Sequence, residues 1–167
     1  MSIFRFALAG ATACLLAAAM TFPAQAKCYG AKERDAVHVR TLQTTLMVAA
    51  LSCRRVLGPE FPAQYNQFMR KHGKELTRQS YVLQAHFKRE YGSGWMSRLD
   101  KFLTAMANDA TRRSMGGGGF CAATRPVFEQ LVASEPTQLA SVSTDYVLAN
   151  GGAVQGCEVK AAKNDAK

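Results

Sequence analysis

The cysteines constrain the fold of this chain most, because they are few, even in number and widely spaced. Cys28, Cys53, Cys121 and Cys157 remain once an N-terminal segment that contains Cys14 is set aside, and they are separated by 25, 68 and 36 residues. No C-x-x-C motif occurs, which excludes a zinc knuckle, a thioredoxin-like redox pair and the haem attachment of a c-type cytochrome. In an oxidising compartment, four such cysteines predict two disulfides.

The first 26 residues have the features of an export signal. Arg5 supplies the positive start, an apolar run extends from Phe6 to Met20, and residues 23–26 place small side chains where a signal peptidase cleaves. We therefore expect cleavage after Ala26 and a protein that is periplasmic or secreted. A retained anchor is disfavoured because the run is shorter than the roughly 20 residues that span a bilayer. A lipoprotein is disfavoured because no large aliphatic residue stands three positions before Cys14.

Three pairings of the four remaining cysteines are possible, and their positions alone do not choose among them. We favour Cys53 with Cys121, which would join two predicted helices, and Cys28 with Cys157, which would tie the chain ends together. Each bond would close a long loop and stabilise the fold by about 3–5 kcal/mol in the entropic model. We expect a structural role for all four, since no neighbouring cysteine or activating base accompanies them.

Apolar residues recur at the helical period of three and four residues in five segments. The predicted helices are Asp35–Leu57, Glu60–Tyr91, Trp95 to just before Gly116, a segment that includes Pro126–Ala133, and Thr137–Ala149. Asp35 is the expected cap of the first helix. Met47, Val48 and Leu51 widen the apolar side of this helix, and the wide apolar side predicts a central position in the bundle. Gly73 marks a point where the second helix could kink or split.

Two glycine and proline features set the expected boundaries of the fourth helix. The run Gly116–Gly119 is expected to be the most flexible stretch, and Pro126 fits a first helical turn, with Phe120 and Cys121 in the turn before it. No pair of strands with a hairpin signal and no repeat of fixed period is found. The fold class is therefore all-α: a compact four- to five-helix bundle with two disulfides, preceded by a cleaved N-terminal signal peptide.

The export signal and a polar end divide the chain into three parts. Removing residues 1–26 leaves 141 of the 167 residues, enough to bury one core and too few for two. We assign residues 1–26 to the signal peptide, 27–159 to a single disulfide-linked helical domain and 160–167 to a disordered polar tail. The mature chain is predicted to contain no transmembrane segment.

Positive charge is the strongest departure of this chain from an average domain. The net charge is +9, and +8 once the signal has removed Arg5. Four adjacent cation pairs carry much of it: Arg54 and Arg55, Arg70 and Lys71, Lys88 and Arg89, and Arg112 and Arg113. Three of the pairs fall in the last turns of predicted helices, where the helix dipole favours cations. The alternative interpretation is that the four cation pairs form a shared anion-binding face.

No constellation of catalytic or metal-binding residues stands out. The glycine run is followed by Phe120, not by the lysine of a phosphate-binding loop. His86 and Glu90 lie one helical turn apart but lack a third ligand, and no serine lies in a nucleophile motif. We expect no cofactor, no bound metal and, on balance, no enzymatic activity.

These observations support three functional hypotheses. The first is a non-enzymatic periplasmic or secreted binding protein whose basic surface engages an anionic envelope component or a protein partner, with nucleic acid an unlikely partner in that compartment. The second is an envelope-acting hydrolase with a site assembled from dispersed residues such as Glu75, His86 and Glu90. The third is a small-ligand carrier that uses a cavity within the bundle.

Overall fold

The computed structural model describes residues 28–116, 118–152 and 154–157. Its elements are α1 (Ala31–Ser52), α2 (Arg54–Leu57), α3 (Glu60–Tyr91), α4 (Trp95–Ser114), α5 (Gly118–Ala133) and α6 (Leu139–Ala149), with short 3-10 turns at Gly92–Gly94 and Pro136–Gln138. Within these ranges there is no strand, and the only bridge is an isolated parallel one between Tyr29 and Gly156. The predicted all-α class is confirmed. The predicted signal peptide and polar tail lie outside the described residues.

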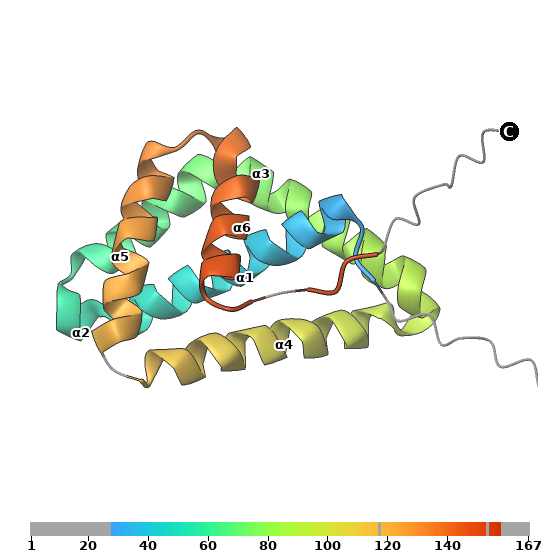
Figure 1. Ribbon diagram of the computed structural model, residues 1–167, viewed down its shortest axis with the longest axis horizontal. Coiled ribbons are helices and arrows are strands. Elements are labelled where there is room, and N and C mark those ends of the chain that lie inside the picture. Colours follow the sequence, from blue (N-terminus) through green and yellow to red (C-terminus); the bar gives the residue numbers. More distant parts are fainter. Residues whose placement is uncertain (1–27, 117, 153, 158–167) are drawn as a thin grey trace, which may run out of the picture.

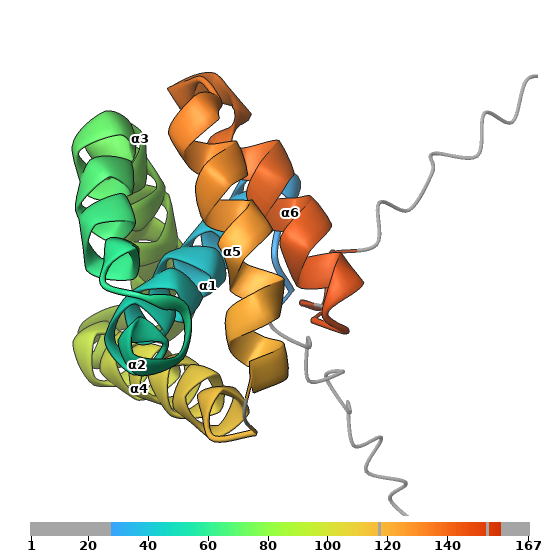
Figure 2. The same ribbon diagram turned by 90° about the vertical axis from the view of Figure 1, so that its left-hand side faces the viewer.

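Helix α1 is the central helix of the bundle. It packs against α3, α4, α5 and α6, and eleven of its residues are buried (Figures 1 and 2). It begins at Ala31, four residues before the predicted cap Asp35, because the Glu33 carboxylate accepts a hydrogen bond from the Gly30 amide at 2.9 Å and so caps the helix. It ends at Ser52, and Cys53 separates it from the single turn of α2.

Helix α3 runs for 32 residues without a break, as its periodicity predicts. Gly73 neither ends nor splits it, and the position of a Cβ at this glycine is open space. Phe61 and Phe68 of α3 are fully buried, and the Phe61 ring meets the Phe128 ring of α5 edge to face at 5.3 Å between centroids. Such aromatic pairs stabilise a core by about 0.5–1.5 kcal/mol beyond their burial.

Helix α5 begins at Gly118, eight residues earlier than Pro126, where its first turn was predicted. The disulfide explains this, because Cys121 is bonded to Cys53 and fixes the first turns of α5 against the end of α1. Pro126 lies inside the helix and has no amide hydrogen to donate to the carbonyl oxygen of Ala122. Ala122 is exposed, so water can bond to this carbonyl instead. Gly118 and Gly119 of the glycine run thus belong to α5.

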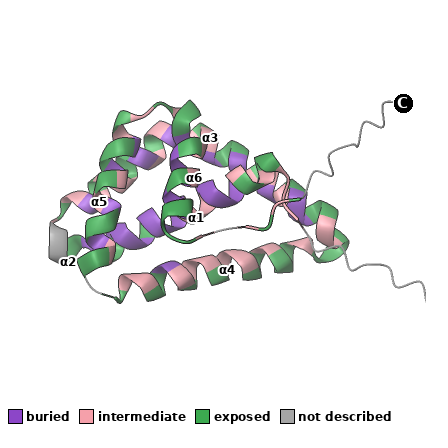
Figure 3. Cartoon of the chain, viewed as in Figure 1, coloured by how far each residue is buried: buried purple, intermediate pink, exposed green. Residues whose placement is uncertain are grey.

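Helix α4 packs less closely than the others. Ala110 is the one buried residue among its twenty. Partly buried residues, pink in Figure 3, run along the helix, and they include an apolar stripe of Leu99, Phe102, Leu103 and Met106. α4 and α6 both pack on α1 but barely touch each other. The apolar stripe of α4 packs against the core on α1 and α3, while α6 leaves the neighbouring side of α4 without close cover.

The two disulfides have the predicted pairing. Cys53 and Cys121 are buried, with their Cα atoms 5.5 Å apart. Cys28 and Cys157 join the two ends of the described chain, and there the Tyr29 amide donates to Gln155 O at 3.0 Å. Cys157 is exposed, so the two bonds lie in different environments. None of the helices in the described ranges combines the length and apolarity that crossing a membrane requires.

Candidate functional site

The four cation pairs do not form one surface. Arg54 and Arg55 on α2 lie at the same end of the bundle as Arg112 and Arg113 of α4, the end that faces the viewer in Figure 2. The Ser52 hydroxyl, at the end of α1, lies 3.5 Å from that of Ser114, at the end of α4, and so brings these segments together. The other two pairs lie along α3.

Three of the four paired cations along α3 make contacts within the protein. Lys71 donates to the carbonyl oxygens of Val132 and Ala133 at 2.9 and 3.3 Å and so caps the C-terminus of α5. Lys88 lies 4.7 Å from the centre of the Trp95 ring. Arg89 is paired with carboxylates, as described below. For these three residues the structure shows intramolecular contacts at the predicted anion-binding positions, while Arg70 is exposed.

Large apolar side chains lie beside the arginines of the first group. The described residues expose six such side chains. Two of them, Met47 and Leu51, lie in the last two turns of α1, and a third, Met115, directly follows α4. Leu51 and Met115 are 76% and 75% exposed. We call this surface the α1–α4 end, consisting of Met47, Leu51, Arg54, Arg55, Arg112, Arg113 and Met115. Of the three residues that widen the apolar side of α1, Val48 is buried, whereas Met47 and Leu51 are exposed near the end of the helix.

The α1–α4 end is positively charged. Arg112 and Arg113 share one carboxylate, that of Asp109, with Arg113 Nε 3.0 Å from Asp109 Oδ2. Arg54 and Arg55 are both exposed on a helix of a single turn. Four guanidinium groups and one carboxylate leave a local excess of three positive charges beside exposed leucine and methionine.

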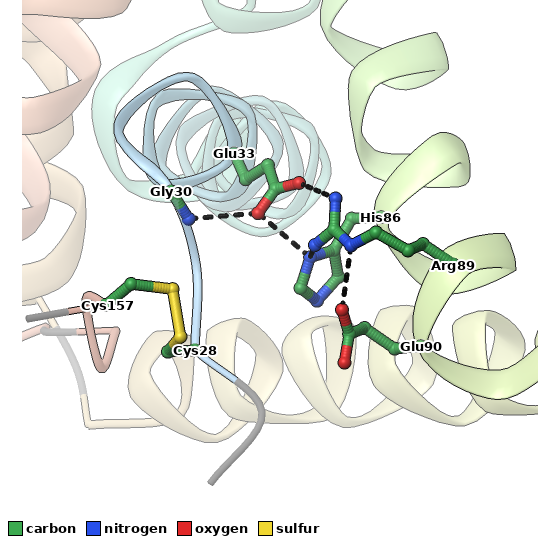
Figure 4. Close-up of a disulfide and its surroundings, with 7 residues drawn as sticks. All are labelled: Cys28, Gly30, Glu33, His86, Arg89, Glu90 and Cys157. Atoms are coloured by element: carbon green, nitrogen blue, oxygen red, sulfur yellow. Dashed lines mark hydrogen bonds and ion pairs between the residues drawn. A yellow bond between two sulfur atoms is a disulfide. The ribbon is translucent and has the colours of Figure 1, made fainter. Parts of the chain in front are cut away.

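A second cluster of charged residues lies at the opposite end of α1 (Figure 4). Glu33 Oε1 accepts a hydrogen bond from Arg89 Nη1 at 2.6 Å, and Glu33 Oε2 lies 3.0 Å from His86 Nδ1. The Tyr29 ring stacks on His86 with 4.2 Å between centroids. The Arg89 guanidinium, more than any other group, lowers the pKa of the Glu33 carboxyl to about 2. We call this group the Glu33 cluster.

The imidazole of His86 is enclosed within the Glu33 cluster. The His86 side chain is 1% exposed. Arg89 Nη2 lies 3.0 Å from His86 Nδ1, the atom that also faces Glu33, so Arg89 and Glu33 contact the same side of the imidazole ring. Glu75 lies three turns earlier on α3, bonded to Arg78 and Gln79. None of the linings of five hollows between described residues contains Glu75, His86 or Glu90. Glu75 therefore lies apart from His86 and Glu90, which are one turn apart on α3 and both contact Arg89.

A groove separates α4 from α6 and the segment that follows it. One hollow of about 260 Å³ is lined by polar residues that include Asp109, Arg113 and Asn150. A second, of about 230 Å³, is mostly apolar and includes Phe102, Met106 and Val154. Both have the same four residues in their linings, Thr41, Asp109, Val147 and Gly152, and are therefore continuous. We call them together the α4–α6 groove.

His38 of α1 lines the apolar part of this groove. Burial lowers the pKa of its imidazole, which favours the neutral ring. Its Nδ1 lies 3.0 Å from the Thr144 hydroxyl, and its buried Nε2 has no hydrogen-bond partner among the described residues. A neutral histidine adds no charge to the apolar part of the groove.

Comparison with protein-family models, with curated proteins and with solved structures finds no match. In the ranges that the structure describes, no three histidine, cysteine, aspartate or glutamate side chains lie close enough together to hold a metal ion.

Proposed function

We propose that this chain is an exported, non-enzymatic helical protein that binds an anionic component of the cell envelope through its α1–α4 end. The observation that supports it best is that four arginines, on α2 and in the last turn of α4, lie at the same end of the bundle as exposed Leu51 and Met115. Basic residues draw a protein to an anionic surface, and apolar side chains among them strengthen the contact by entering the interface.

The compartment is part of the same proposal. Two disulfides are typical of proteins that mature in an oxidising space, such as the periplasm or the outside of a cell. Residues 1–26 would direct export and be removed after Ala26. In that compartment the nearest polyanions are phospholipid head groups, lipopolysaccharide and peptidoglycan-linked polymers, and nucleic acid is a remote partner.

The experiment measures binding of the disulfide-bonded protein to liposomes rich in phosphatidylglycerol, to lipopolysaccharide and to peptidoglycan, each from 50 to 500 mM salt (about 14 to 4 Å of screening length). The test variant is Arg54→Glu/Arg55→Glu. The control is Arg70→Glu/Lys74→Glu, which makes the same charge change at two exposed positions on α3. Neutral phosphatidylcholine liposomes serve as the uncharged surface.

We expect the protein to bind at least one anionic component, and the affinity to fall as salt rises. The α2 variant should lose at least tenfold in affinity, at about 1 kcal/mol for each basic residue near the surface, and the α3 control should lose about twofold. Equal losses in the two variants would show that net charge, and not the α1–α4 end, is responsible. Absence of binding to all three would favour a protein partner instead.

A further inference from the structure

The α4–α6 groove has the form of a binding site for an elongated molecule. Each of its hollows is smaller than the roughly 300 Å³ at which ligand pockets begin, but the two together exceed that size. Both are partly open to solvent along α4. This shape fits a chain lying along the helix better than a compact molecule enclosed on all sides.

The groove is apolar at one end and polar at the other. Val37, Phe102, Ala105, Met106 and Val154 line the first part. Water in contact with such a surface is displaced favourably by a hydrocarbon chain. Phe102, Met106 and Val154 are partly buried against the core, and the hollow that they line is partly open to solvent.

Two arginines share a single carboxylate at the polar end, although Arg112 lies outside the lining. Arg113 lines this end, and Asp109, the one carboxylate in the lining, is already paired with both Arg112 and Arg113. The Tyr146 phenol lies there too, and burial raises its pKa, which keeps the hydroxyl protonated and able to donate. Cationic and hydroxyl donors at this end complement an anionic head group.

We propose that the α4–α6 groove binds a single-chain anionic amphiphile, with its hydrocarbon chain along α4 and its head group at Arg113. A fatty acid and a lysophospholipid share this chemistry. The proposal does not rest on binding to an envelope surface, because Leu51, Arg54 and Arg55 of the α1–α4 end line neither hollow. Arg113 is the one residue of that end that also lines the groove. The chain would then hold one amphiphile in addition to contacting an anionic surface.

The first test is calorimetric titration of the disulfide-bonded protein with dodecanoate below its micellar concentration. Ala105→Trp places an indole in the apolar part of the groove. Thr104→Trp is the matched control, since it adds the same side chain at the next residue of α4, which is exposed and lines neither hollow. We expect one saturable site, at least a tenfold loss of affinity in Ala105→Trp and less than a twofold change in Thr104→Trp.

The second test concerns the head group. Dodecyltrimethylammonium, which has the same chain and the opposite charge, should bind at least tenfold more weakly than dodecanoate, and Arg113→Gln should remove most of this preference. Titration with lysophosphatidylglycerol, compared with dodecanoate, shows whether the groove prefers a lysophospholipid or a fatty acid. Far-ultraviolet circular dichroism verifies that each variant is folded.

Several outcomes would overturn the proposal. They are the absence of saturable dodecanoate binding, equal affinities of Ala105→Trp and Thr104→Trp, and equal binding of the cationic and anionic amphiphiles. Failure here is distinguishable from failure of the proposed function, because Ala105→Trp should keep its liposome binding and Arg54→Glu/Arg55→Glu should keep its dodecanoate binding.

Discussion

Replacing Glu33 by glutamine tests the physical role of the Glu33 cluster. The change removes the negative charge but keeps an oxygen that can accept the hydrogen bond from the Gly30 amide, so the cap of α1 is preserved. What is lost is the attraction between the carboxylate and Arg89, whose Nη1 lies 2.6 Å away. The measured difference in stability therefore reports mainly on this ion pair.

The size of the effect follows from the pKa of Glu33. A fall from 4.5 to about 2 corresponds to about 3 kcal/mol, at about 1.4 kcal/mol for each pKa unit. The Arg89 side chain is 56% exposed, and solvent screening reduces the energy of such pairs. We therefore expect Glu33→Gln to lower the free energy of unfolding by about 1–2 kcal/mol at pH 7.

The pH dependence provides the sharper test. Because the pKa of Glu33 is lower in the folded than in the unfolded chain, its contribution is fully present well above pH 4.5 and is lost as pH falls towards 2. Wild type and Glu33→Gln should thus differ at pH 7 and converge near pH 2. Urea unfolding followed by far-ultraviolet circular dichroism, with both disulfides intact, measures the difference at each pH.

Glu75→Gln is the matched control. Glu75 also has a lowered pKa, caused first by Arg78, but the two residues lie three apart on one helix and the Arg78 side chain is 63% exposed. We expect it to lower stability by less than about 0.5 kcal/mol. An equal cost for the two variants, or a cost of Glu33→Gln that stays constant from pH 7 to pH 2, would refute the reasoning.

Three further predictions concern the scaffold. Gly73→Ala should raise the free energy of unfolding by about 0.5–1 kcal/mol, because this glycine lies inside α3 and its Cβ would meet nothing, and urea unfolding measures it. Phe128→Ala should lower it by about 3–5 kcal/mol, since the ring is fully buried against Phe61. Mild reduction followed by alkylation and mass spectrometry should label Cys28 and Cys157 before the buried pair, because Cys157 is exposed; simultaneous labelling would contradict this.

The helices that the sequence predicts well are those with long, regular apolar periods. α3 begins at Glu60 and ends at Tyr91 as expected, since a proline near its start and a glycine after its end mark both boundaries. The start of α5 was missed because a local rule placed Pro126 in a first turn, whereas a covalent bond from Cys121 to the end of α1 extends the helix in front of it. Long-range constraints of this kind leave no mark in the local sequence.

The candidate sites were less predictable than the fold. Adjacent cations are visible in the sequence, but only the helix arrangement shows that Arg54 and Arg112 share one end while Lys88 lies along α3. The α4–α6 groove arises from a helix that packs loosely, and periodicity alone does not distinguish a stripe that is buried from one that is half-covered.

The Cys28–Cys157 bond brings both ends of the described chain to one point, at the start of α1. The α1–α4 end lies at the far end of that helix, whose 22 residues span about 33 Å (Figure 1). If the protein is attached to a support through either terminus, the arginines of the α1–α4 end therefore face away from that support. On a sensor chip the protein would present the same face to an applied vesicle, whichever terminus carries the tag.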